Sequence, residues 1–219
     1  MITLYHTPLS INSRRVWVTL IEKGLTFELK ELSLAGDQFT PDFLALNPFH
    51  HIPVLVDGDT TVIESFAMLD YLEAKYPSPP LMPTAPEAIA RARMVQMVTL
   101  NELLPATLPL TMKHLFGKND PEAVAKAHKN AAVVLNFWTQ QLQDDTFFGG
   151  QQLTLADIVA GTVAAWFPEM ELSLKDYPAL AAWRQRLMER PAWQQTQVTA
   201  EALAEFKARM QQRMTGSKT

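Results

Sequence analysis

The sequence predicts a chain of two domains, a small mixed α/β domain followed by an all-helical one. Strand and helix patterns alternate in the first third of the chain, and beyond it only helical periodicity is found. Between the two regions, five of the ten residues from Pro77 to Pro86 are proline. Because proline can continue neither a helix nor a central strand, we expect domains over 1–77 and 87–219, joined by a proline-rich linker over 78–86.

The first domain is expected to contain a β-α-β unit followed by a hairpin and a helix. A short strand opens the chain, an apolar helix ends at Gly24, and a second strand follows. Two further strands flank Asp57-Gly58, a strong hairpin signal because glycine readily takes positive φ. This order gives a small mixed sheet with helices packed on it. The expected strands are 2–6, 26–32, 53–56 and 60–63, and the closing helix is 65–76.

The second domain is expected to be a helical bundle. Its first helix, 87–115, contains Pro105 and Pro109, which are expected to bend it. Thr154 and Asp157 have the spacing of a capping box, in which each side chain bonds the backbone of the other residue, so a helix begins there. Further helices are expected over 121–144, 178–190 and 201–214.

Composition limits the possible functions. The chain is 47% hydrophobic and 19% charged with a net charge of −4, so it is an ordinary globular protein without a basic footprint for nucleic acid or anionic membrane. It opens without a signal-peptide pattern, and its most apolar stretch, 158–167, is shorter than the about 20 residues that span a bilayer. We therefore expect a cytoplasmic protein that binds neither nucleic acid nor membrane.

Several catalytic chemistries are excluded by missing residues. The chain has no cysteine, so a disulfide framework, a thiolate metal site and a cysteine nucleophile are excluded. The five histidines form no set with metal-ligand spacing, and a nucleophile elbow, a phosphate loop and a dinucleotide fingerprint are missing. Any thiol chemistry must use a thiol that the protein binds.

The strongest local signal is Ile52-Pro53 at the start of a strand. Proline there removes a backbone donor and can form a cis peptide bond. The N–H and C=O of Ile52 would then face outward as an unpaired edge, able to hold a peptide as an added strand. The alternative is that Pro53 only starts a strand.

Two helix starts could bind anions. Ser65 follows Glu64 where a strand passes into a helix, and the free N–H groups of such a helix would accept a carboxylate. Ser10, Asn12 and Ser13 stand between a strand and the positive end of a helix dipole, where a hydroxyl can stabilise an anion. In both places the serine could instead be a plain helix cap.

Together these residues resemble the cytosolic glutathione S-transferases over nearly the whole chain. The shared features are the two domains with their proline linker, Asn47-Pro48 before Ile52-Pro53, Glu64-Ser65 at one helix start and Thr154-Leu155-Ala156-Asp157 at another. The resemblance implies a thioredoxin-like fold for the α/β N-terminal domain and an all-α helical bundle for the C-terminal domain.

The resemblance also implies roles for individual residues. Ser10, four residues before Arg14, matches the serine of the theta and delta classes that activates the glutathione thiol, and Ser13 could share or replace that role. Phe66 stands where delta-like enzymes often place an arginine, and Gln38 stands where some relatives place a histidine. The residues expected to bind glutathione are Gln38, His50, His51, Ile52, Pro53, Glu64 and Ser65.

The expected function is conjugation of the glutathione thiolate to small apolar electrophiles, a detoxification reaction, with glutathione as co-substrate and no metal or tightly bound cofactor. Two alternatives stay open: a glutathione-dependent peroxidase or disulfide reductase, and a non-catalytic glutathione-binding scaffold. Helical spacing predicts a second-substrate pocket from Asn101, Leu104 and Leu108, with Trp166 or Phe167 on a facing helix. A homodimer is expected, in which Phe49 either inserts into the other subunit or packs on its own helix.

Overall fold

The computed structural model describes residues 1–216, and of residues 209–216 the backbone alone. These residues form two compact units. The first comprises Met1–Leu81 with Pro191–Val198, and the second comprises Met82–Arg190 with the residues from Thr199 onward. The first is α/β and the second is all-helical, so the predicted fold class is confirmed. The sequence pattern does not indicate that Pro191–Val198 packs with the first unit.

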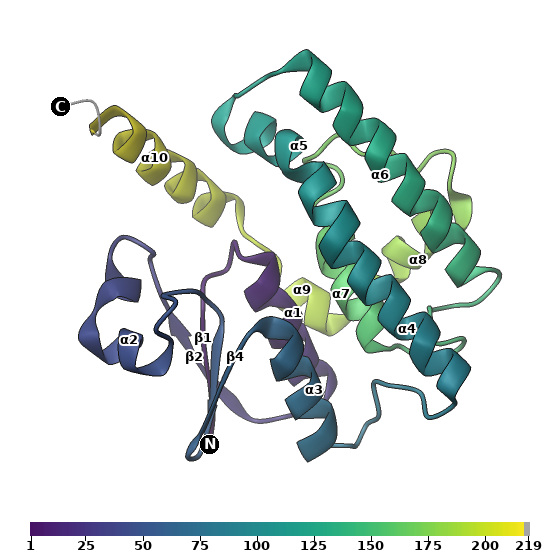
Figure 1. Ribbon diagram of the computed structural model, residues 1–219, viewed down its shortest axis with the longest axis horizontal. Helices are drawn as coiled ribbons and strands as arrows, with labels where there is room; N and C mark the ends of the chain where they lie inside the picture. Colours follow the sequence, from purple (N-terminus) through teal and green to yellow (C-terminus); the bar gives the residue numbers. More distant parts are fainter. Residues whose placement is uncertain (217–219) are drawn as a thin grey trace. The chain divides into compact units, whose positions relative to one another are not determined.

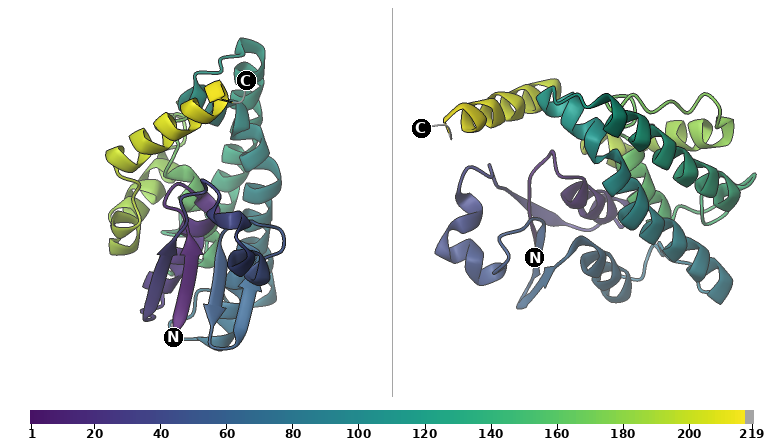
Figure 2. Two further views of the ribbon diagram at one scale, coloured as in Figure 1. Left: turned by 90° about the vertical axis from the view of Figure 1, so that its left-hand side faces the viewer. Right: turned by 45° about the horizontal axis from the view of Figure 1, so that its top comes forward.

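The first unit is built on a four-stranded mixed sheet with the order β2-β1-β3-β4. Strand β1 runs parallel to β2 and antiparallel to β3, and β3 and β4 form the expected hairpin. Helices α1 and α3 lie on one face of the sheet and α2 lies on the other (Figure 1), and Figure 2 shows the strands side by side. The elements are β1 (Ile2–His6), α1 (Ile11–Glu22), β2 (Phe27–Glu31), the 3-10 helix η1 (Asp37–Phe39), α2 (Pro41–Leu46), β3 (Val54–Asp57), β4 (Thr60–Ile63) and α3 (Ser65–Lys75).

Alternation along the strands separates two small apolar cores. Ile2 and Leu4 of β1 are buried with the apolar faces of α1 and α3, which include Val16 and Met68. On the other face, Val54 is buried with Phe43 of α2 and with Leu32. The sheet is therefore covered on both faces, and its ends are left to carry functional loops.

Strand register brings the candidate segments to one end of the sheet. Tyr5 near the end of β1 pairs with Val54 at the start of β3, and Val54 pairs with Ile63 at the end of β4. The chain that follows β1, precedes β3 and follows β4 must therefore emerge at the same end. Those segments are Thr7–Ser10, Ile52-Pro53 and Glu64-Ser65.

The segment 191–198 joins the first unit through a buried arginine. Arg14 of α1 donates through Nε to Thr196 Oγ1 (3.1 Å) and through Nη2 to the Trp193 carbonyl (3.1 Å). Trp193 lies in the short helix α9 (Pro191–Gln195) and is itself buried. A buried guanidinium needs such acceptors, so these bonds explain why this late segment packs on α1.

The second unit contains two long neighbouring helical segments and shorter helices (Figures 1 and 2). The expected helix over 87–115 is interrupted by the π-helical turn η2. Pro105 has no N–H to donate and its ring crowds the carbonyl of Asn101, so the helix widens and Leu104 N–H bonds the Thr99 carbonyl instead. The elements are α4 (Pro86–Val98), η2 (Thr99–Leu103), α5 (Leu104–Phe116), α6 (Pro121–Leu142), α7 (Leu155–Ala164), α8 (Pro178–Met188) and α10 (Ala200–Gly216).

The predicted capping box at the start of α7 is confirmed and is more extensive than expected. Asp157 Oδ2 accepts from Thr154 N and Oγ1 (both 2.8 Å), and Oδ1 accepts from Phe148 N and Trp183 Nε1 (both 2.9 Å). Burial raises the pKa of Asp157, and the four donated bonds oppose that rise. This carboxyl ties a helix start, a loop and a second helix together inside the second unit.

Candidate functional site

Ser10 is the N-cap residue of α1. Its Oγ accepts from Ser13 N–H at 3.2 Å, and its side chain is partly exposed. The capping bond uses a lone pair of the oxygen and leaves the hydroxyl proton free to donate. The cap and the anion-stabilising role, which the sequence left as alternatives, are therefore compatible in this one side chain.

Ser13 and Asn12 are placed differently from Ser10. Ser13 is 1% exposed, and its Oγ has no hydrogen-bond partner in the part of the chain that the structure describes. Asn12 is exposed on the first turn of α1. Because a buried hydroxyl cannot reach a ligand without rearrangement, the geometry favours Ser10 over Ser13.

The loop before β3 is organised by Asn47, which is 2% exposed. Its Nδ2 donates to the His51 carbonyl (2.8 Å), and its Oδ1 accepts from Phe49 N–H (3.0 Å). His50 N–H bonds the Asn47 carbonyl (3.0 Å), and His50 has a φ of 50°, in the left-handed region. Asn47 thereby fixes the path of the chain into Ile52.

The Ile52-Pro53 peptide bond is cis, as the sequence allowed. Within residues 1–216, neither the N–H nor the C=O of Ile52 makes a hydrogen bond, while Val54 already pairs in the sheet. Ile52 is half-buried and Pro53 is buried. The unpaired edge that was expected at this position is therefore present.

His50 and His51 directly precede Ile52 in the chain, and Gln38 lies in η1 next to Phe39. The ring of Phe39, next to Gln38 in η1, is 5.0 Å from the His50 ring, which is 5.3 Å from the His51 ring. Gln38 is buried, and its Oε1 has no partner among the described residues. The two histidines are exposed.

Helix α3 begins at Ser65, as expected, so Ser65 is not its cap, which the sequence had left as an alternative. Glu64 is the N-cap residue and Ser65 is the first helical residue. Glu64 has φ 66° and ψ 117°, a conformation that costs a non-glycine residue about 1–3 kcal/mol. No side chain of the described residues caps this helix, so its first N–H groups keep their partial positive charge. Ser65 is 6% exposed and Glu64 is exposed.

His6 lies behind the Ser10 loop at the end of β1. It is 2% exposed, its ring lies 5.1 Å from that of Trp17, and burial lowers its pKa to about 4. His6 is therefore neutral near pH 7 and adds no charge to the site. Among residues 1–216, no group of three or more acidic or histidine side chains is placed to hold a metal ion.

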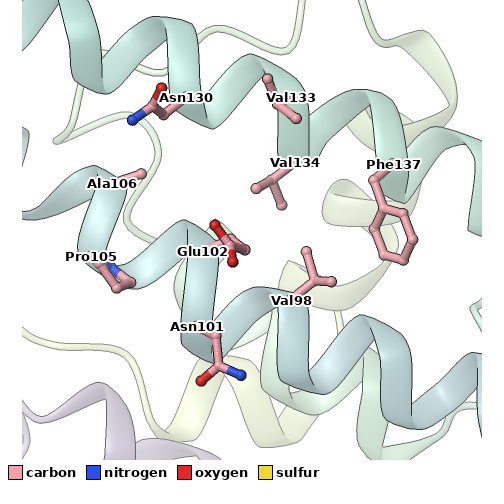
Figure 3. Close-up of a pocket in the computed structure, with 9 residues that line it drawn as sticks. All are labelled: Val98, Asn101, Glu102, Pro105, Ala106, Asn130, Val133, Val134 and Phe137. Atoms are coloured by element: carbon pink, nitrogen blue, oxygen red, sulfur yellow. The ribbon is translucent and has the colours of Figure 1, made fainter.

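The second-substrate residues do not all meet in the second unit. A cavity of about 570 Å³ lies between α4–α5 and α6, where Val98 and Glu102 point toward α6 (Figure 3). Asn101 lines it, whereas Leu104 is half-buried elsewhere on the segment and Leu108 is 54% exposed. Trp166 was expected on a facing helix but lies in the turn after α7. The lining residues are Val98, Asn101, Glu102, Pro105, Ala106, Asn130, Val133, Val134 and Phe137.

Two features of the site were missed in the sequence. The organising role of Asn47 has a signal, because asparagine before proline favours a side-chain-closed turn. The positive φ of Glu64 has no such signal in the sequence, since that conformation is associated with glycine and asparagine.

Of all the described helices, none is both long enough and apolar enough to cross a bilayer.

Comparison with known proteins adds to this geometry. Residues 4–80 match the family model "Glutathione S-transferase, N-terminal domain", and residues 69–191 match "Glutathione S-transferase, C-terminal domain". Glutathione S-transferase 3 of Zea mays is 35% identical over 204 residues, covering 88% of this chain and 91% of that protein.

Solved structures are similar over most of the chain. A delta-class glutathione transferase of Nilaparvata lugens has a TM-score of 0.81 at 26% identity, covering 95% of this chain and 97% of that one. A structure of glutathione S-transferase-I bound with lactoylglutathione has a TM-score of 0.80 at 28% identity, covering 89% and 97%.

Proposed function

The chain belongs to the glutathione S-transferase family and is a glutathione transferase, and we propose that Ser10 activates the thiol of its glutathione substrate. The observation that carries this proposal is the position of the Ser10 hydroxyl. It is partly exposed, it has a free proton, and it follows β1 at one end of the sheet. The unpaired main chain of Ile52 and the uncapped start of α3 lie at the same end. On this proposal the protein is a serine-type enzyme of the family.

The required stabilisation matches what Ser10 can supply. A free thiol with a pKa near 8.5 is only a few per cent ionised at pH 7. Lowering that pKa by about two units requires about 2.7 kcal/mol of preferential binding of the thiolate. A hydroxyl that donates to an anion contributes about 1.5–3 kcal/mol, and the start of α1 adds its helix dipole.

Glutathione would bind as an extended peptide along the end of the sheet. The cysteinyl residue pairs with the N–H and C=O of Ile52, next to Pro53, as an added strand. The γ-glutamyl carboxylate lies at the first N–H groups of α3 and at Ser65, and the γ-glutamyl amino group faces Glu64. The glycyl end reaches Gln38, His50 and His51. The sulfur then lies beside Ser10.

In the reaction the bound thiol first loses its proton to solvent. The thiolate sulfur donates an electron pair to the electrophilic carbon, an S–C bond forms, and the leaving group departs with the electrons of its own bond. The Ser10 hydroxyl donates to the sulfur before bond formation and is released as the negative charge disappears. A peroxidase or disulfide reductase would use the same thiolate to attack an oxygen or sulfur atom. The similar proteins are named as glutathione S-transferases, so they favour neither of these activities nor a scaffold without activity.

The two domains are proposed to bind different substrates. We assign the glutathione site to residues 1–77 and the electrophile site to residues 87–219, with 78–86 as the linker. Leu108 is the exposed apolar member of the proposed set, so its side chain is available to an apolar electrophile, with Asn101, Leu104 and Trp166 as further candidates. A cytoplasmic location likewise stays a prediction.

A second copy of the chain offers a cavity for the exposed ring of Phe49. Phe49 is 58% exposed although it is aromatic, and the cavity between α4–α5 and α6 presents Val98, Val133 and Phe137. Val133 is itself 66% exposed. We propose that Phe49 of one protomer enters this cavity in a second copy, which would cover both apolar surfaces.

Calorimetry tests the function and the position of the site together. Wild type should bind S-hexylglutathione, and Ser65→Ala and Glu64→Ala should each weaken that binding about tenfold or more, because each removes a contact to a charged group. The same variants should leave the binding of an apolar dye unchanged. Equal losses for both ligands would mean that the glutathione site lies elsewhere.

A further inference from the structure

Phe39 is an exposed aromatic residue whose ring lies against an exposed histidine. It ends the 3-10 helix η1 and is 53% exposed. Its ring centroid lies 5.0 Å from that of His50, and the two ring planes are inclined by 52°. His50 is exposed as well, and the pair belongs to neither apolar core of the first unit. The contact therefore orders two side chains that lie at the surface and would otherwise sample several rotamers.

The backbone that carries Phe39 is fixed by hydrogen bonds within its own loop. The Asp37 carboxylate accepts from Ser33 N–H (2.7 Å) and from Ser33 Oγ (2.8 and 2.9 Å). Phe39 N–H bonds the Gly36 carbonyl (2.9 Å), and Thr40 Oγ1 donates to the Asp37 carbonyl (2.9 Å). These bonds close the segment between β2 and α2 into a compact turn. The ring of Phe39 is therefore held out from a fixed support.

The His50 imidazole is oriented by ring contacts. Its backbone is already fixed, because His50 N–H bonds the Asn47 carbonyl (3.0 Å). The imidazole itself makes no hydrogen bond within residues 1–216, and its neighbours are the rings of Phe39 at 5.0 Å and His51 at 5.3 Å. Aromatic rings in contact have preferred relative orientations. Loss of the Phe39 ring would therefore free the imidazole while its backbone stays in place.

An imidazole always carries an N–H donor, so a fixed imidazole is a ready partner for a carboxylate. On the basis of the proposed function, we propose that Phe39 is a positioning residue, which holds the His50 imidazole in the orientation that meets the glycyl carboxylate of glutathione. Phe39 itself does not touch the substrate. Because the side chain is ordered before the ligand arrives, less rotamer freedom is lost on binding, and the affinity for the glycyl end rises.

A comparison of two ligands tests the proposal. Glutathione and γ-glutamylcysteine ethylamide, which has a methyl group in place of the glycyl carboxylate, are titrated calorimetrically into wild type and Phe39→Ala. The variant should bind glutathione about 3–10-fold more weakly and the ethylamide less than about twofold more weakly. Phe39→Tyr, which keeps the ring, should bind both ligands as wild type does. In Phe39→Ala the KM for glutathione should rise while kcat stays within about twofold.

A double-mutant cycle shows whether Phe39 acts through His50. In a His50→Ala background, Phe39→Ala should weaken glutathione binding by less than about twofold further. The matched control is Met94→Ala, which removes another exposed apolar side chain, 46% exposed in α4 of the second unit, and should alter neither affinity. Additive losses in the cycle would overturn the proposal, as would an unchanged glutathione affinity or equal losses for both ligands in Phe39→Ala.

Folding, assembly and the identity of the site are checked separately. Circular dichroism melts accompany each variant, and Phe39→Leu, which keeps an apolar side chain without the ring, provides the same comparison if Phe39→Ala is unfolded. Sedimentation of Phe39→Ala that shifts toward the monomer would overturn the proposal, because the ring would then be a contact with a second copy. Wild type that fails to bind glutathione would contradict the proposed function itself. Wild type that binds glutathione without the selective loss in Phe39→Ala would contradict only the role of Phe39.

Discussion

Replacing Ser10 by alanine removes two functions of one oxygen atom. The Oγ accepts from Ser13 N–H at 3.2 Å and, in the proposed complex, donates to the glutathione thiolate. Loss of the donor to an anion, about 1.5–3 kcal/mol, raises the pKa of the bound thiol by about one to two units. Loss of the helix cap lowers the free energy of unfolding by about 1 kcal/mol, equivalent to about 2–4 °C in Tm.

The pH dependence distinguishes these two effects. If the bound thiol has a pKa near 6.5 in wild type and near 8 in Ser10→Ala, thiolate formation at pH 6.5 falls about fifteenfold, and the deficit disappears above about pH 9 where both are ionised. Ultraviolet absorbance of the thiolate and kcat/KM for an aryl halide, measured across this range, report it directly.

Two variants serve as controls for this prediction. Ser10→Thr keeps the hydroxyl and should retain the low pKa, and Ser13→Ala removes a buried Oγ without a partner in the described part of the chain and should be silent. An unchanged thiol titration in Ser10→Ala, or the full shift in Ser13→Ala, would refute the assignment.

Asp157→Asn should lower the free energy of unfolding by about 2–5 kcal/mol, because the amide NH₂ of the asparagine would face two of the four donors that the carboxyl group now satisfies. Thermal melts measure this loss, and a Tm within about 2 °C of wild type would contradict the prediction. His6 is buried with a pKa of about 4 against about 6.5 when unfolded, so the unfolded state takes up the proton first and stability falls by about 3 kcal/mol as the pH falls from about 6.5 to about 4. Urea midpoints at pH 7 and pH 5 should show about 2 kcal/mol of this loss in wild type and a smaller loss in His6→Phe. An equal loss of unfolding free energy in the two proteins would exclude His6 as its source. Phe49→Ala should shift sedimentation at micromolar concentration from dimer toward the 24.6 kDa chain mass, and a wild-type monomer would refute the dimer itself. Leu108→Ala should raise the KM for an aryl halide several-fold and leave the KM for glutathione within about twofold, whereas two unchanged constants would place the electrophile pocket elsewhere.

The fold was predictable where local chemistry decides it. Asp57-Gly58 determines a hairpin because glycine tolerates positive φ, and φ at Gly58 is 61°. The spacing of Thr154 and Asp157 determines a helix start whatever packs on it. The packing of Pro191–Val198 on α1 was not predictable, since it depends on Arg14 finding acceptors far along the chain, and periodicity does not identify partners.

The candidate site was predictable as a set of segments and less so in its details. The segments that contain Ser10, Ile52 and Ser65 were each identified from the sequence, whereas the strand register that brings them to one end of the sheet depends on how the strands pair. The start of α3 at Ser65 was predicted, but the positive φ of Glu64 before it was not, because this residue type does not favour that conformation. The contact of Phe39 with His50 was not predictable either, since it depends on how η1 packs on the loop before β3.

A crystal structure with bound glutathione tests the central claim most directly. The account predicts that the glutathione sulfur lies about 3–3.5 Å from Ser10 Oγ, that the cysteinyl residue pairs with the main chain of Ile52, and that the γ-glutamyl carboxylate lies at Ser65 and the start of α3. A sulfur atom that contacts another side chain, with the main chain of Ile52 left unpaired, would contradict it.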